Sequence, residues 1–174
     1  CVASSVRAEP KTIVAFGDSL TQGYGLPADL GFVPKMGYWL GAQGVSVRMV
    51  NAGVSGDTTA GGLARLDWTL AETADLVIVN LGSNDMLRGL DPRLIYDNLQ
   101  KIMAKLHSKN MQTLLIGHLA PLNYGKDYKK DYDQVFQQIA IENDTEFYPF
   151  FFDALVTIGE VVPNMQLYFQ ADGL

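Results

Sequence analysis

Residues 12–19 read TIVAFGDS, an apolar run that leads directly into a glycine, an aspartate and a serine. The pattern predicts a buried strand over residues 12–16 that ends in a tight turn and presents Ser19 at its carboxyl end. A serine in that place can act as a nucleophile. Gly, Asp and Ser are also common in ordinary turns, so this stretch by itself leaves both interpretations open.

Two further apolar runs end in polar turns. Residues 45–50 lead into NAGVSGDT at 51–58, and the run that begins at residue 76 leads into LGSND at 81–85. The carboxyl ends of parallel strands meet at one edge of a sheet. We therefore expect all three turns to lie at the same edge.

Strand and helix patterns alternate along the chain, as is typical of βαβ units around a parallel sheet. Apolar runs without strict alternation, as expected for strands buried on both faces, predict strands at 12–16, 45–50, 76–81, 113–118 and 146–151. Helices are expected at 34–43, 60–72, 92–108 and 128–142. The fold class is therefore α/β: a three-layer α/β/α sandwich on a five-stranded parallel sheet, flavodoxin-like.

The helix expected at 92–108 has the clearest signals. Asp91 suits the N-cap, and Pro92 suits the first helical position. Apolar residues then recur at helical spacing to give one buried stripe. Gly44 is expected to end the helix at 34–43.

Composition narrows the classes of function. The 174 residues fit one domain, and the net charge of −6 argues against binding to nucleic acid or to anionic lipid. No apolar run approaches the roughly 20 residues that span a bilayer. The sequence has no metal-ligand spacing, phosphate loop or cofactor motif, so neither a metal nor a cofactor is expected. Cys1 is the single cysteine, which allows no disulfide within the chain.

Residues 1–8, CVASSVRA, have the pattern of the end of a signal peptide, with Val6-Arg7-Ala8 as a small-x-small cleavage site. A lipidated Cys1 and an ordinary chain terminus are the alternatives. The signal-peptide interpretation predicts a periplasmic or secreted protein whose domain covers residues 9–174. A monomer or weak dimer is expected.

The order and the sequences of the three turns resemble those of the SGNH hydrolase family, also called the GDSL family. The likeness is greatest to its small bacterial periplasmic members, the thioesterase I, lysophospholipase and arylesterase group, and it covers about residues 11–174. The resemblance implies the same flavodoxin-like fold. It also implies a serine hydrolase of acyl esters, thioesters or lysophospholipids that works through an acyl-enzyme.

Site residues follow from the resemblance. Ser19 matches the nucleophile, and its backbone N–H, the backbone N–H of Gly56 and the side-chain amide of Asn84 match the oxyanion donors. The family's base is a histidine in a late Asp-x-x-His motif. Asp172 matches the aspartate, and the position of the histidine follows Leu174. A chain that lacks a starting methionine and ends inside this motif is expected to be a piece of a longer gene product, nearly inactive by itself.

His118 is the alternative base, because it lies at the carboxyl end of the fourth expected strand. His107 is expected only to favour the C-terminal dipole of its helix. The carboxylates beside the key residues are expected to brace the turns through hydrogen bonds rather than to do chemistry; they are Asp18, Asp57 and Asp85.

Residues 119–125, LAPLNYG, form a loop by their Pro, Asn and Gly content. By resemblance, this loop lies on the substrate side, and its expected substrate-binding residues are Leu119, Pro121, Asn123 and Tyr124. A loop that merely packs on the core is the alternative. Residues 150–152, three phenylalanines, are expected in a strand and the core.

Two other functions remain open from the sequence. The same family contains carbohydrate O-deacetylases, which would have an open polar cleft instead of a narrow apolar groove. A non-catalytic binding protein that kept the fold without the histidine is the other alternative.

Overall fold

The computed structural model describes residues 9–70, 73–153, 156–157 and 160–161. Its main sheet is parallel and has the strand order β2-β1-β3-β4-β5. The strands are β1 (Lys11–Gly17), β2 (Val47–Gly53), β3 (Leu76–Asn80), β4 (Gln112–Ile116) and β5 (Glu146–Tyr148). This order is that of flavodoxin-like folds, which confirms the predicted fold class.

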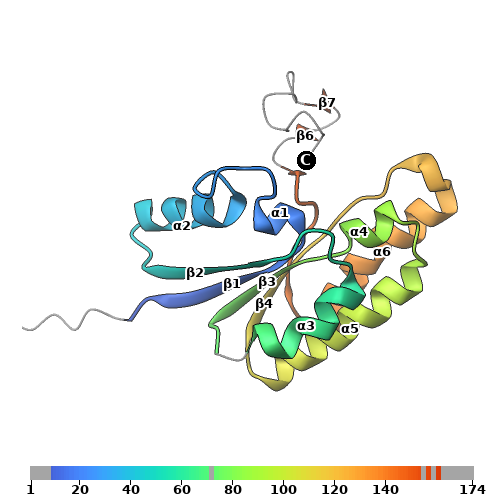
Figure 1. Cartoon of the computed structure of the whole chain (residues 1–174). Helices are drawn as coiled ribbons and strands as arrows, with labels where there is room; N and C mark the ends of the chain where they lie inside the picture. The colour runs from blue at the N-terminus through green and yellow to red at the C-terminus, as the bar shows by residue number, and fades with distance from the viewer. Residues whose placement is uncertain (1–8, 71–72, 154–155, 158–159, 162–174) are drawn as a thin grey trace, which may run out of the picture.

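Helices cover both faces of the sheet (Figure 1). Helix α2 (Phe32–Ala42) lies on one face, where Met36 and Leu40 pack against alternate strand residues such as Ile13 and Ile78. The other face holds α3 (Thr59–Thr69), α5 (Pro92–Ser108) and α6 (Lys126–Glu142) over a larger core. Successive strand residues point to opposite faces, so one apolar run supplies both layers.

Four short elements were not expected from the sequence. Helix α1 (Ser19–Gln22) and helix α4 (Ser83–Leu87) stand where the sequence predicted only polar turns, and β6 (Val156–Thr157) pairs antiparallel with β7 (Glu160–Val161). Helices of four or five residues are too short to show an apolar period. The Asp18 side chain, which caps α1 by accepting from the Leu20 N–H, is the local signal that marks its start.

The observed element boundaries agree best with the predicted ones where capping signals are strong. The helix expected at 92–108 has those bounds, with the Asp91 side chain as its cap. Strand β2 instead runs on through residues 51–53, which pair with the end of β1. Strand β5 ends at Tyr148, since Pro149 has no N–H to continue the ladder. Residues 150–152 therefore follow the sheet instead of extending it.

The first three strands end level with one another. Gly17 at the end of β1 pairs with Gly53 at the end of β2 and with Asn80 at the end of β3. The turns that follow these strands therefore start side by side at the carboxyl edge of the sheet, as expected. Within the described ranges, no helix has the length and apolarity that a bilayer span requires.

Candidate active site

Ser19 is the first residue of α1, directly after β1. Asp18 precedes it and is fully buried. The Asp18 carboxylate accepts hydrogen bonds from the Leu20 N–H at 3.0 Å, from Asn84 Nδ2 at 3.3 Å and from the Ser83 hydroxyl. One carboxylate therefore joins the helix that presents Ser19 to the helix that carries Asn84.

Burial raises the pKa of Asp18 above its usual value, and the hydrogen bonds from Ser83, Leu20 and Asn84 act in the opposite direction. These donors favour the ionised carboxylate that they surround. The expectation that Asp18 braces the turn is confirmed by these contacts.

Gly56 lies in a tight turn over residues 54–57. The Asp57 N–H donates to the Val54 carbonyl at 3.1 Å, and Gly56 has a φ of +81°. Ser55 is not among the described residues with a positive φ, so this is a type II turn, which favours glycine at its third position. The conformation of Gly56 thus has a backbone reason, beside any role of its N–H.

Charged side chains link the turn at residues 51–58 and the helix α3 that follows it to the end of β1 and to helix α4. Asp57 pairs with Arg65 at 2.5 Å, and Arg65 also donates to the Gly17 carbonyl at 3.0 Å. Asp85, which is buried, accepts from the Thr59 N–H at 2.8 Å and from the Thr59 hydroxyl at 2.6 Å. Asp57 and Asp85 therefore brace the turns, as the sequence predicted.

The loop at 119–125 reaches the segment that follows Asn84. Residues 122–124 form a short 3₁₀ turn, and the Tyr124 hydroxyl donates to the Leu87 carbonyl at 3.0 Å. The candidate residues of this loop are all exposed: Leu119, Pro121, Asn123 and Tyr124. Leu87 is 63% exposed beside them and was missed, because a leucine in a polar sequence gives no sign of which way it points.

A family model described as GDSL-like Lipase/Acylhydrolase matches residues 15–169. The chain belongs to this GDSL-like family. The matched residues contain all three turns and reach from the end of β1 almost to the end of the chain. The resemblance that the turns suggested is thereby confirmed.

Relatives of this GDSL-like chain agree with that assignment. Esterase TesA of Pseudomonas aeruginosa is 37% identical over 169 residues, which cover 97% of this chain and 81% of TesA. The thioesterase 1/protease 1/lysophospholipase L1 of Escherichia coli K12 is 34% identical over 144 residues, 82% of this chain and 67% of the relative. The crystal structure of AlinE4, an SGNH-hydrolase family esterase, superposes with a TM-score of 0.84 at 37% identity, covering 96% of this chain and 90% of that one.

The two histidines of this GDSL-like chain lie just after β4 and in the last turn of α5. His118 follows β4, is only 4% exposed and packs edge-on against Phe136 at 5.5 Å between ring centroids. Its Nε2 has no hydrogen-bond partner among the described residues, and burial lowers its pKa to about 4. His107 is exposed in the last turn of α5, at the opposite edge of the sheet. No contact in the described part of the chain joins either imidazole to the Ser19 hydroxyl.

Asp172 lies outside the described residues, so its placement relative to Ser19 stays a prediction. Within the described ranges, no three His, Cys, Asp or Glu side chains gather in a way that would hold a metal ion.

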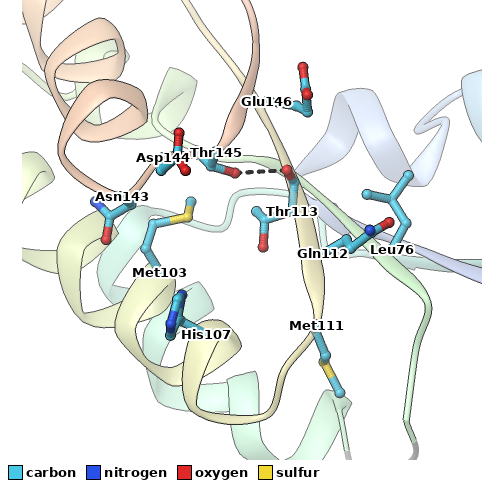
Figure 2. A pocket seen from close by; sticks show the side chains of 10 residues that line it. All are labelled: Leu76, Met103, His107, Met111, Gln112, Thr113, Asn143, Asp144, Thr145 and Glu146. Carbon is cyan, nitrogen blue, oxygen red and sulfur yellow. Dashed lines mark hydrogen bonds between the residues drawn. The ribbon is translucent and has the colours of Figure 1, made fainter.

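A cavity of about 420 Å³ lies at the amino end of β3, β4 and β5, beside the end of α5 (Figure 2). Thr145 crosses it to donate to the Thr113 carbonyl at 2.7 Å. Its lining contains Met103, His107, Met111 and Asp144 but none of the three motif turns. Because Ser19 stands at the other edge of the sheet, this cavity is separate from the candidate site.

Proposed function

We propose that this chain hydrolyses acyl esters and thioesters through an acyl-enzyme formed on Ser19. The observation that carries the proposal is the meeting of three turns at one sheet edge, where Asp18 binds the Asn84 amide next to Ser19. Membership of the GDSL-like family supports the same reaction class.

Attack of the Ser19 hydroxyl on a carbonyl carbon would create a tetrahedral oxyanion. We propose that the Ser19 N–H, the Gly56 N–H and the Asn84 amide stabilise it. A primary amide has two hydrogens, so Asn84 can donate one to Asp18 and the other to the oxyanion. Donors held in place before the reaction stabilise the charge without reorganisation, and each typically contributes about 2.7–4 kcal/mol.

Ser19 needs a base, which we propose to be a histidine placed after Leu174 and oriented by Asp172. His118 is a poor candidate for this role, because it is buried and no carboxylate among the described residues orients it. A chain continued with histidine after Leu174 should hydrolyse esters much faster than residues 9–174. Equal rates would instead point to His118.

Apolar side chains on the segments after β3 and β4 are proposed to form the substrate side of the site. Four exposed apolar side chains lie on the segments after β3 and β4: Leu87, Leu119, Leu122 and Tyr124. Each methylene that a substrate buries against such a surface gives about 0.8 kcal/mol. This surface favours acyl chains longer than acetyl over the compact, polar group of an acetylated carbohydrate.

The test of the nucleophile uses the full-length protein and two serine variants. Ser19→Ala should abolish hydrolysis of p-nitrophenyl butyrate, because loss of a nucleophile costs on the order of 10⁴ to 10⁶ in rate. A fluorophosphonate probe should add mass to the peptide that contains Ser19 in the parent protein only. The control is Ser108→Ala, whose hydroxyl donates to the Lys105 carbonyl at the far end of α5.

More than about a hundredth of the parent activity in pure, folded Ser19→Ala protein would refute the assignment. A full-length parent protein that neither hydrolyses esters nor reacts with the probe would instead support the non-catalytic binding protein. Export, expected from residues 6–8, is also a proposal, which cell fractionation would test. A monomer or weak dimer is proposed as well, which sedimentation would test.

A further inference from the structure

The turn that carries Gly56 is held from two sides by exposed polar side chains. The Ser55 N–H donates to Gln22 Oε1 at 2.8 Å, and Gln22 is the last residue of α1, the helix that begins with Ser19. Arg88 Nη2 donates to the Gly56 carbonyl at 2.9 Å, and Arg88 directly follows α4, which carries Asn84. Each anchor therefore links the turn to the helix of another proposed oxyanion donor.

Neither anchor is needed to form the turn. The turn is closed by a hydrogen bond from the Asp57 N–H to the Val54 carbonyl at 3.1 Å. The Val54 N–H also donates to the Gly17 carbonyl at 3.0 Å. Gln22 and Arg88 are both exposed and belong to neither core cluster. Exposed hydrogen bonds add little to stability, since water competes for both partners. Their distinctive effect is to fix where the turn lies relative to α1 and α4.

We propose that Gln22 and Arg88 are positioning residues that hold the Gly56 N–H in line with the Ser19 N–H and the Asn84 amide. Gln22 fixes the peptide group before Ser55, and Arg88 fixes the peptide group after Gly56. The inference rests on the proposed function, in which Gly56 donates to the oxyanion. Catalytic donors must be held within about 0.5 Å of their productive positions, so a loosened turn lowers the rate although every donor is still present.

Two pairs of variants separate the hydrogen bonds from the side chains that make them. Gln22→Leu removes the acceptor for the Ser55 N–H, whereas Gln22→Glu keeps one. Arg88→Met removes the donor to the Gly56 carbonyl, whereas Arg88→Lys keeps a cationic donor on a flexible stem. Arg93→Met is the control, because Arg93 is an exposed arginine at the start of α5 that belongs to none of the three turns.

Steady-state kinetics of the full-length protein give the first measurement. We expect kcat to fall about 10- to 100-fold in Gln22→Leu and Arg88→Met, with KM changed less than about twofold, because displacement of a donor acts on the transition state. Gln22→Glu and Arg88→Lys should recover most of the loss, and Arg93→Met should match the parent protein.

The second measurement does not depend on activity. In ¹⁵N-labelled protein, the residual dipolar coupling and the ¹⁵N relaxation of the Gly56 N–H report its orientation and order. Both should change in Gln22→Leu and Arg88→Met, while amides of the central strands keep their values.

An unchanged Gly56 N–H in both variants would overturn the positioning role, whatever the kinetics. A reoriented N–H together with a lower kcat supports it. A reoriented N–H with parent kcat would show that Gly56 is not an oxyanion donor, which removes that part of the proposed function and the inference with it.

Discussion

In the proposed mechanism, the Asn84 side chain serves both structure and chemistry. Its Nδ2 donates at 3.3 Å to buried Asp18, the residue before Ser19, and this bond restrains the amide. Because the amide group is planar, the bond to Asp18 also sets the direction of the second amide hydrogen. A polar side chain held by a buried carboxylate is a fixed donor instead of a mobile one.

Asn84→Ala should lower kcat by roughly 10² to 10³, because one oxyanion donor is lost. KM should change much less, since the donor acts on charge that develops only in the transition state. Hydrolysis of p-nitrophenyl esters measures both constants, and circular dichroism must show that the variant is folded. A change confined to KM would mean that Asn84 only holds the substrate.

His118 presents the opposite case, a titratable side chain that the proposed mechanism leaves unused. Burial lowers its pKa to about 4, from 6.5 for an exposed histidine. A group whose pKa is lowered by folding contributes stability above its unfolded pKa and loses it as the pH falls. Stability should therefore decrease between about pH 6.5 and pH 4.

Replacing His118 by leucine should remove this pH dependence. Urea unfolding at pH 7.5 and pH 4.5 should show a smaller drop for His118→Leu than for the parent protein. At pH 7.5 the variant should also keep its esterase activity within about threefold, if His118 is not the base. A variant that shows the same drop on acidification would assign the dependence to other groups.

Close approach of α1 to β2 places the first two turns together. A Cβ on Gly53 would lie 2.2 Å from the Gln22 nitrogen and 2.8 Å from the Asp18 carbonyl oxygen. Both contacts are with backbone atoms, which cannot move aside as a flexible side chain would. Gly53 is therefore a packing requirement of this pair of elements.

Gly53→Ala should lower the free energy of unfolding by about 1–3 kcal/mol, the usual cost of overpacking. Gly41→Ala is the matched control, because Gly41 lies in helix α2 and a Cβ there would meet nothing within 4 Å. That control should gain roughly 0.5–1 kcal/mol, since alanine favours the helix. Urea unfolding of the two variants measures the difference, and equal stabilities would contradict the close packing of α1 on β2.

At the scale of the whole molecule, the sheet order brings the proposed substrate surface together. Strands β3 and β4 are neighbours, so Leu87 and Tyr124 meet although 37 positions separate them. The segments that carry them expose several apolar side chains, and the protein carries a net charge of −6. Neutral acyl chains suit such a surface better than polyanions do.

We expect kcat/KM to rise from p-nitrophenyl acetate towards the hexanoate or octanoate. Each methylene buried on the surface should add about 0.8 kcal/mol, close to fourfold per methylene at most. Tyr124→Ala should flatten this rise and leave the acetate rate nearly unchanged. A maximum at acetate would favour the O-deacetylase alternative.

The sequence by itself determined the fold class and the three motif turns. Alternating apolar runs predicted a parallel sheet, and the Asp91-Pro92 signal fixed the start of α5, because caps and periodicity are local properties of the chain. The turns at Ser19, Gly56 and Asn84 were also predictable from the sequence, since each follows a strand.

Only the tertiary structure decided how those turns are joined. The Asp18–Asn84 hydrogen bond spans 66 positions, and the bonds from Ser55 to Gln22 and from Arg88 to Gly56 span 33 and 32. Such contacts depend on strand order and on the level ends of β1, β2 and β3, which no local pattern encodes. The roles proposed for Gln22, Leu87 and Arg88 rest on that three-dimensional arrangement, because each residue contacts one that is distant in the sequence.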